Sequence, residues 1–156
     1  MKKIFGIVIL LCFISPSYGQ SESISVHSIV NFYKYNDENI KNTDAVDFIL
    51  EVKNNSSKPI PDLGVDNRSK YVNFYINGKL NNPLSLYNGV ESIYSKKIIE
   101  PGESDKLDLG GWILTEDSGI IQKYGYEFTV QWEYMKIKSE ILLVNLKKKT
   151  AISVVN

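Results

Sequence analysis

Two tyrosines and an asparagine alternate along one short segment, and their side chains are suited to binding. They are Tyr71, Asn73 and Tyr75. Successive side chains of an extended strand point to opposite faces of a sheet, so these three are expected to share one outward face. A tyrosine offers a rigid apolar ring with a polar tip, which suits stacking on a sugar ring or contact with a protein partner. The apolar residues between them, expected in the core, are Val72, Phe74 and Ile76.

A second pair of tyrosines, Tyr33 and Tyr35, has the same spacing in the first extended segment of the chain. Their rings would enlarge the binding platform if the two segments lay on one face. The plainer interpretation is that tyrosine is favoured in strands, so that all four rings cover a sheet face or sit under a loop. These tyrosines and Asn73 are the predicted binding residues.

Residues that usually support catalysis are scarce. His27 is the single histidine, and its alternating segment predicts a solvent-facing strand position without the partners that a general base requires. Glu127 and Glu133 share one strand face, but the strand rise separates them by about 20 Å, too far for a glycosidase pair. We therefore predict a non-enzymatic protein and assign no catalytic residue.

Loop carboxylates raise the alternative of a calcium site, because calcium prefers oxygen ligands. Their spacing matches no calcium-binding loop motif. One histidine and one cysteine cannot form a multi-histidine or multi-cysteine site. No metal and no cofactor are predicted. The carboxylates considered are Asp37, Glu38, Asp44, Asp62 and Asp66.

The first 19 residues are typical of a cleaved export signal. Two lysines precede an apolar run from Ile4 to Ile14, and small residues up to Gly19 are placed for cleavage. The run is much shorter than the roughly 20 apolar residues that a membrane-spanning helix needs. Two alternatives remain open. One is an uncleaved anchor, and the other is lipid attachment at Cys12, where the small preceding residues of lipoprotein signals are absent.

Cleavage after Gly19 would leave residues 20–156 as a single domain. Removing 19 of 156 residues leaves 137, which is enough for a real core. Two lysines leave with the signal, so 16 Lys and Arg face 18 Asp and Glu, a net charge of −2. Such a domain has no electrostatic footprint for nucleic acid. The single cysteine is also lost, so we expect no disulfide, and we expect no membrane span after cleavage.

Alternation of apolar and polar residues predicts strands along most of the remaining chain. Asn77-Gly78 predicts a two-residue hairpin turn, because both residues accept a positive φ. In the segment from Ile24 to Tyr35 the alternation shifts near Ile29, where a bulge is expected. A helical turn is credible from Thr115 to Gln122. The other strands are expected at Val46 to Lys53, Leu84 to Tyr87, Ser92 to Ile99, Lys106 to Leu109, Tyr126 to Tyr134 and Glu140 to Leu146.

The connections between these strands are read from their turn residues. Residues 64–70 are expected to form a loop, and Lys136 to Lys138 a turn. Two prolines leave Ile60 to Leu63 as an edge piece at best. The last run, Ala151 to Val155, is expected as a fraying tail or a final edge strand.

About seven to eight short strands predict an all-β fold, an antiparallel immunoglobulin-like β-sandwich. A closed barrel is the alternative. In the sandwich, Tyr124 or Tyr126 would form a tyrosine corner, with its hydroxyl bonded to upstream backbone. Ordinary core packing explains both tyrosines equally well.

Two stretches resemble bacterial immunoglobulin-like exported domains. They run from Phe48 through Asn54-Asn55-Ser56-Ser57-Lys58-Pro59 to Ile60, and from Glu100 to Ser104 with its Pro-Gly-Glu turn. The same stretches are similar, more loosely, to the Bacillus intracellular proteinase inhibitors. The resemblance implies a β-sandwich fold and assigns no function to any residue.

The sequence thus favours an exported binding module that recognises a protein or glycan through a sheet face or loops. The alternative is a structural or assembly component of the cell envelope that pairs through edge strands. A hydrolase has the least support. A composition rich in Lys, Ile and Asn with a single arginine is typical of AT-rich bacterial genomes. We therefore expect a periplasmic or extracellular bacterial protein.

Overall fold

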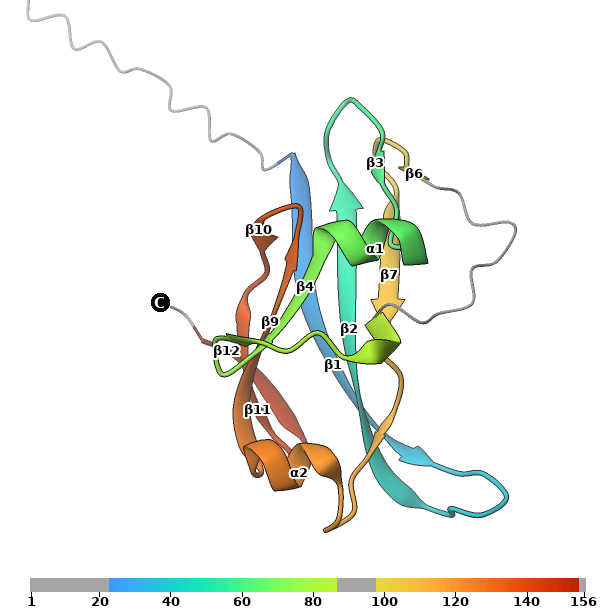
Figure 1. Cartoon of the computed structure of the whole chain (residues 1–156), viewed down its shortest axis with the longest axis vertical. Coiled ribbons are helices and arrows are strands. Elements are labelled where there is room, and N and C mark those ends of the chain that lie inside the picture. Colours follow the sequence, from blue (N-terminus) through green and yellow to red (C-terminus); the bar gives the residue numbers. More distant parts are fainter. Residues whose placement is uncertain (1–22, 87–97, 155–156) are drawn as a thin grey trace, which may run out of the picture.

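The computed structural model describes residues 23–86 and 98–154 and contains two antiparallel sheets that pack against one another (Figure 1). The first sheet has the order β1-β2-β7, and β8 pairs with β2. The second has the order β12-β11-β9-β4-β5, and β10 pairs with β9. The strands of the first sheet are β1 (Ile24–Tyr35), β2 (Thr43–Asn54), β7 (Ser104–Asp108) and β8 (Trp112–Ile113). Those of the second are β4 (Val72–Ile76), β5 (Lys79–Leu80), β9 (Glu127–Tyr134), β10 (Ile137–Lys138), β11 (Ile141–Asn145) and β12 (Thr150–Val154).

Short elements connect and flank the two sheets. A separate two-stranded ribbon pairs β3 (Ile60–Pro61) with β6 (Ile98–Ile99), so the predicted edge piece is confirmed at two residues. Helix α2 (Gly119–Tyr124) overlaps the helical turn predicted from Thr115 to Gln122. The remaining elements are helix α1 (Val65–Tyr71) and the 3-10 helix η1 (Leu84–Leu86).

The predicted all-β sandwich is confirmed. Seven of the twelve strands in the described residues have five or more residues, and the other five are two-residue strands, which explains the higher count. The order β1-β2-β7 corresponds to strands A-B-E of an immunoglobulin-like sandwich, and β11-β9-β4-β5 to G-F-C-C′. The two sheets share no strand pair within the described ranges, so these strands do not form the alternative closed barrel.

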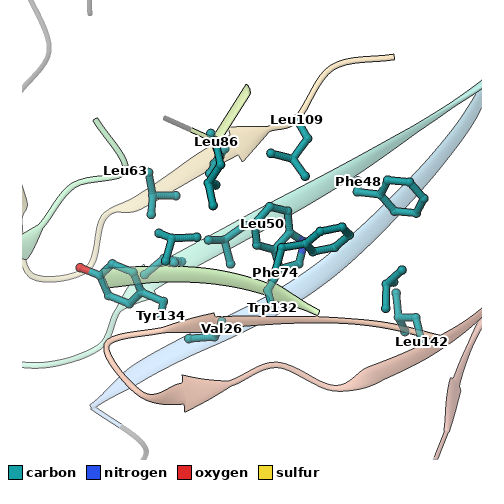
Figure 2. Close-up of a cluster of buried hydrophobic side chains, with 14 of the residues drawn as sticks. Val26, Phe48, Leu50, Leu63, Phe74, Leu86, Leu109, Trp132, Tyr134 and Leu142 are labelled. Atoms are coloured by element: carbon teal, nitrogen blue, oxygen red, sulfur yellow. The ribbon is translucent and has the colours of Figure 1, made fainter. Parts of the chain in front are cut away.

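Aromatic residues from both sheets meet in the core (Figure 2). Phe48 of β2 lies 5.6 Å from Phe74 of β4, measured between ring centroids, and Phe74 lies 4.5 Å from Trp132 of β9. All three side chains are buried. The inward residues of β2 and β9 are those that the alternation predicts: Val46, Phe48, Leu50 and Val52, followed by Phe128, Val130, Trp132 and Tyr134.

The expected bulge near Ile29 is absent. Strands β1 and β2 pair without interruption from Ile24 opposite Asn54 to Tyr35 opposite Thr43. The apparent shift arises because an inward position holds the polar Ser28 while the outward position beside it holds Ile29. Ser28 is buried because its hydroxyl lies 2.6 Å from that of Ser139, next to β10.

Residues 64–70 form a helix rather than the expected loop. Helix α1 has no apolar stripe, and its buried residue is Arg68, so its sequence carries no helical signal. Asp62 orders the start of the helix, because its Oδ1 accepts hydrogen bonds from the backbone of Gly64 and the side chain of Asn67. The strand expected at Leu84 to Tyr87 is also wrong, since η1 follows Pro83 there and Tyr87 lies outside the described residues.

Several strand boundaries differ from the prediction. Of the strand expected at Ser92 to Ile99, the structure describes Ile98–Ile99, which is β6. The turn expected at Lys136 to Lys138 lies instead at Met135 and Lys136. The side chains of β11 alternate between half-buried and buried. The final run does form an edge strand, β12.

The expected tyrosine corner is not formed by either candidate. The Tyr124 hydroxyl donates a 2.7 Å hydrogen bond to the side chain of Asn81, and Tyr126 is exposed. The hydroxyl that does reach upstream backbone belongs to Tyr134, which donates to the carbonyl of Pro61. Burial raises the pKa of this Tyr134 hydroxyl far above its ordinary value.

Candidate binding site

A cleft of about 380 Å³ lies where β4 and β9 meet the end of α1. Asn73 of β4 and Glu133 of β9 are direct partners in the antiparallel pairing, so their side chains stand side by side on the outer face. The backbone of Met135 donates a 2.9 Å hydrogen bond to the carbonyl of Tyr71, which joins the β9–β10 turn to α1. The residues that line this cleft, called the β4–β9 cleft below, are Lys70, Tyr71, Asn73, Glu133, Met135 and Lys136.

A chain of hydrogen bonds fixes the polar wall of the cleft. The Asn73 amide donates to Glu133 Oε1 at 2.9 Å, and the Tyr75 hydroxyl donates to Glu133 Oε2 at 3.3 Å. Asn82 donates to the Asn73 carbonyl oxygen at 3.0 Å and accepts from the backbone of Phe74 at 2.8 Å. Burial and the adjacent Glu133 carboxylate raise the pKa of Tyr75, which keeps its hydroxyl protonated as a donor.

The rim of the cleft is a strained turn. Met135 and Lys136 have φ of 49° and 70° between the paired residues Tyr134 and Ile137. Positive φ costs about 1–2 kcal/mol for a residue with a side chain, and turns of this kind usually carry Asn-Gly. Such strain is found preferentially at functional sites. The turn presents two long side chains, one apolar and one cationic, at the mouth of the cleft.

The structure brings together three of the five predicted binding residues. Tyr71 ends helix α1 instead of beginning the strand, and its half-buried ring packs against the core while lining the cleft. Asn73 and Tyr75 occupy the outward positions of β4 and share Glu133 as their partner. The Lys138 ammonium lies 5.1 Å from the centre of the Tyr75 ring, a cation–π distance.

Tyr33 and Tyr35 do not extend this surface. Both lie on β1, which belongs to the other sheet, so the platform expected from their equal spacing is not formed. The Tyr33 hydroxyl donates to Asp47 at 3.1 Å, and the Tyr35 hydroxyl donates to Asp37 at 3.0 Å. Burial first, and the charge of Asp108 second, raise the pKa of Asp47, whose side chain is buried.

The acidic and basic residues considered for catalysis are separate from one another. His27 is exposed on β1, as predicted, with its Nδ1 3.7 Å from a carboxylate oxygen of Glu140. Glu127 accepts a hydrogen bond from Asn145 at 2.8 Å at the opposite end of β9 from Glu133. Among residues 23–86 and 98–154, no group of three histidine, cysteine or carboxylate side chains is placed to hold a metal ion.

Four residues that line the cleft were not predicted as binding residues: Lys70, Glu133, Met135 and Lys136. Glu133 reaches Asn73 because β4 and β9 pair across 60 positions of sequence, and alternation within one strand carries no signal of that pairing. The Met-Lys turn has no turn signature. The alternation along β9 did place Glu133 on the outward face together with Glu127, but it gave no sign of a binding role.

No family model, curated protein or solved structure matches the chain. None of the helices in the part of the chain that the structure describes is long and apolar enough to cross a membrane.

Proposed function

We propose that this chain is an exported, non-enzymatic binding module and that its β4–β9 cleft recognises a glycan. The observation that carries the proposal is the placement of an aromatic ring, an amide and a carboxylate, from Tyr71, Asn73 and Glu133, in one cleft. Sugar rings present an apolar face together with hydroxyls that both donate and accept hydrogen bonds. This combination of side chains matches both properties.

The fixed polar wall favours binding of a rigid, hydroxyl-rich ligand. Asn73 and Glu133 are already oriented by their own hydrogen bonds, so ligand binding would order few additional side chains. Lys70 and Lys136 supply exposed ammonium donors at the edge of the same cleft. A small apolar ligand would cover these ammonium groups without offering them hydrogen-bond acceptors, which favours a glycan over such a ligand.

The proposal is tested by screening the purified protein on a glycan array and repeating the screen with variants. Lys136→Ala and Asn73→Ala should each weaken the bound signal at least tenfold, since each removes a hydrogen-bonding group of the cleft. Tyr126→Ala is the matched control, because Tyr126 is an exposed tyrosine outside the cleft. Glycan binding that both cleft variants retain would contradict the proposal, and so would binding of a protein partner alone.

A second candidate function, assembly through an edge strand, rests on β12. This strand lies at one end of the six-stranded sheet, and two of its apolar side chains, Ile152 and Val154, are 62% and 40% exposed. An edge strand with exposed apolar residues and no charge of its own is a template for pairing with another strand.

Export to the periplasm or the cell surface rests on residues 1–19, which lie outside the described ranges.

A further inference from the structure

Arg68 is buried in helix α1, and none of the described residues forms an ion pair with it. The side chain is 9% exposed, and two guanidinium nitrogens, Nε and Nη2, are shielded from solvent and make no hydrogen bond. Arginine stays protonated at any ordinary pH. A buried charge is costly unless a counter-charge and hydrogen bonds compensate it. The described part of the chain therefore leaves the charge of Arg68 without a counter-charge.

Two carboxylates that bond the chain just before α1, those of Asp62 and of Asp105 in β7, are engaged elsewhere. Asp62 Oδ1 accepts hydrogen bonds from Gly64 and Asn67 at 3.1 and 2.7 Å. Asp105 Oδ2 accepts a hydrogen bond from the backbone of Leu63 at 2.8 Å. Within the described ranges, none of the ion pairs involves Arg68. These contacts leave the Nε and Nη2 edge of Arg68 open to an anion that is not one of the described side chains.

The two unpartnered nitrogens define which kind of anion fits. In a guanidinium group the N–H bonds of Nε and Nη2 lie along the same edge and point in parallel. That edge binds the two oxygens of a carboxylate or phosphate through two parallel hydrogen bonds. A chloride ion fits this edge poorly, because a single spherical acceptor cannot take two parallel hydrogen bonds. The free edge of Arg68 is thus shaped for an oxyanion.

We propose that Arg68 is the receptor for an oxyanionic group, a carboxylate or a phosphate, of a ligand. Arg68 is the buried residue of α1, a helix of seven residues. Such short surface helices open locally at low free energy. The site does not depend on the proposed glycan function, because Arg68 does not line the β4–β9 cleft.

The test follows thermal unfolding of the purified full chain while sodium phosphate or sodium acetate replaces sodium chloride at constant ionic strength. Wild-type protein should gain about 5 °C in Tm at an oxyanion concentration tenfold above Kd. A response to phosphate without acetate identifies a phosphate-bearing ligand, and the reverse identifies a carboxylate. Arg68→Met should match or exceed the wild-type Tm in chloride and lose the response, because it keeps the apolar stem and removes the buried charge. Lys53→Met, at an exposed position of β2 outside both proposed sites, is the matched control and should keep the response.

Three results would overturn the proposal. One is an oxyanion response of equal size in wild type and Arg68→Met. Another is the absence of any response of wild type to either anion. Anion binding is then also measured by calorimetry, with Arg68→Lys as a folded protein for comparison. The third concerns Glu22 and Glu91, the two carboxylate side chains outside the described residues. If the anions stabilise Glu22→Gln or Glu91→Gln but not wild type, the chain itself supplies the anion that binds Arg68. Asn73→Ala should leave the response unchanged, so failure of the glycan proposal is separable from failure of this one.

Discussion

The amide of Asn73 and the carboxylate of Glu133 face each other across β4 and β9, with 2.9 Å between Asn73 Nδ2 and Glu133 Oε1. The side-chain oxygen of Asn73, Oδ1, accepts a hydrogen bond from Asn82. The second carboxylate oxygen of Glu133, Oε2, accepts one from the Tyr75 hydroxyl. Four side chains from three segments are thereby held in one arrangement. The outer face of the six-stranded sheet therefore carries an ordered polar wall beside the β4–β9 cleft.

Replacing Glu133 with Gln should destabilise the protein by about 1 kcal/mol. One oxygen becomes an NH₂ group, which cannot accept the hydrogen bond that Asn73 or Tyr75 now donates to it. Urea unfolding measures the change. Glu127→Gln is the matched control on the same strand, since Glu127 is exposed and its change should stay within about 0.5 kcal/mol. Equal effects of the two substitutions would show that the wall contributes no more than an ordinary surface contact.

Replacing the Met135-Lys136 turn with Asn-Gly should stabilise the protein by about 1–2 kcal/mol and weaken ligand binding. Both positions have positive φ, which Asn and Gly adopt at lower cost. Chemical denaturation gives the stability change. The reverse exchange, Met-Lys at Asn77-Gly78, tests the same physics away from the cleft, because those residues have φ of 50° and 71°. It should be destabilising, and a neutral result there would remove the strain argument.

Replacing Asp47 with Asn should stabilise the protein near neutral pH, and this gain should shrink as the pH falls and be lost below about pH 4, the ordinary aspartate pKa. The pKa of Asp47 is raised in the folded state, mainly by burial. The folded state therefore binds more protons than the unfolded state just above the unfolded pKa, and stability falls as pH rises through that window. The Asn oxygen can still accept from the Tyr33 hydroxyl.

The pH dependence of the Asp47→Asn effect is measured by denaturation at a series of pH values. Asp44→Asn is an informative comparison because hydrogen bonds from Lys149 and Lys34 lower the pKa of Asp44, the opposite direction. That substitution should be destabilising near neutral pH, with the loss fading in acid. An Asp47→Asn stability change that does not vary with pH would argue against a buried charge at this position.

Replacing Ile152 with Lys should leave monomer stability nearly unchanged, because the side chain is 62% exposed. If β12 pairs with a second copy of the chain, the charge should weaken that self-association at least tenfold. Analytical ultracentrifugation over a range of protein concentrations measures it. A wild-type protein that remains monomeric at all concentrations would remove self-assembly through β12 as a function.

Local signals predicted much of the sandwich from the sequence. The alternation along β2 and β9 placed their core residues correctly, because one face of each strand is buried. The hairpin at Asn77-Gly78 was also correct, since its residue types match the positive φ that the turn requires. The turn at Met135-Lys136 has the same sign of φ and was missed. Met and Lys rarely adopt a positive φ, so the sequence at this turn carries no turn signal.

The candidate site was predicted only in part, because its residues meet through tertiary pairing. The spacing of Asn73 and Tyr75 was enough to place both on one face of β4. Their partner Glu133 depends on which strands become neighbours. The same limitation explains why Tyr33 and Tyr35 were wrongly added to the binding surface. Their spacing was correct for a strand, but it gave no information on which sheet contains that strand. Helix α1 was missed because its buried residue is a charged arginine.

The central claim, that the β4–β9 cleft binds a glycan, is tested most directly by nuclear magnetic resonance. The glycan that gives the strongest array signal is titrated into ¹⁵N-labelled protein, and the perturbed backbone amides are mapped. The account predicts that the largest shifts lie at residues 70–75 and 133–136 and that Lys136→Ala removes them. Shifts confined to β12 or to the tip of the β1–β2 hairpin would contradict it.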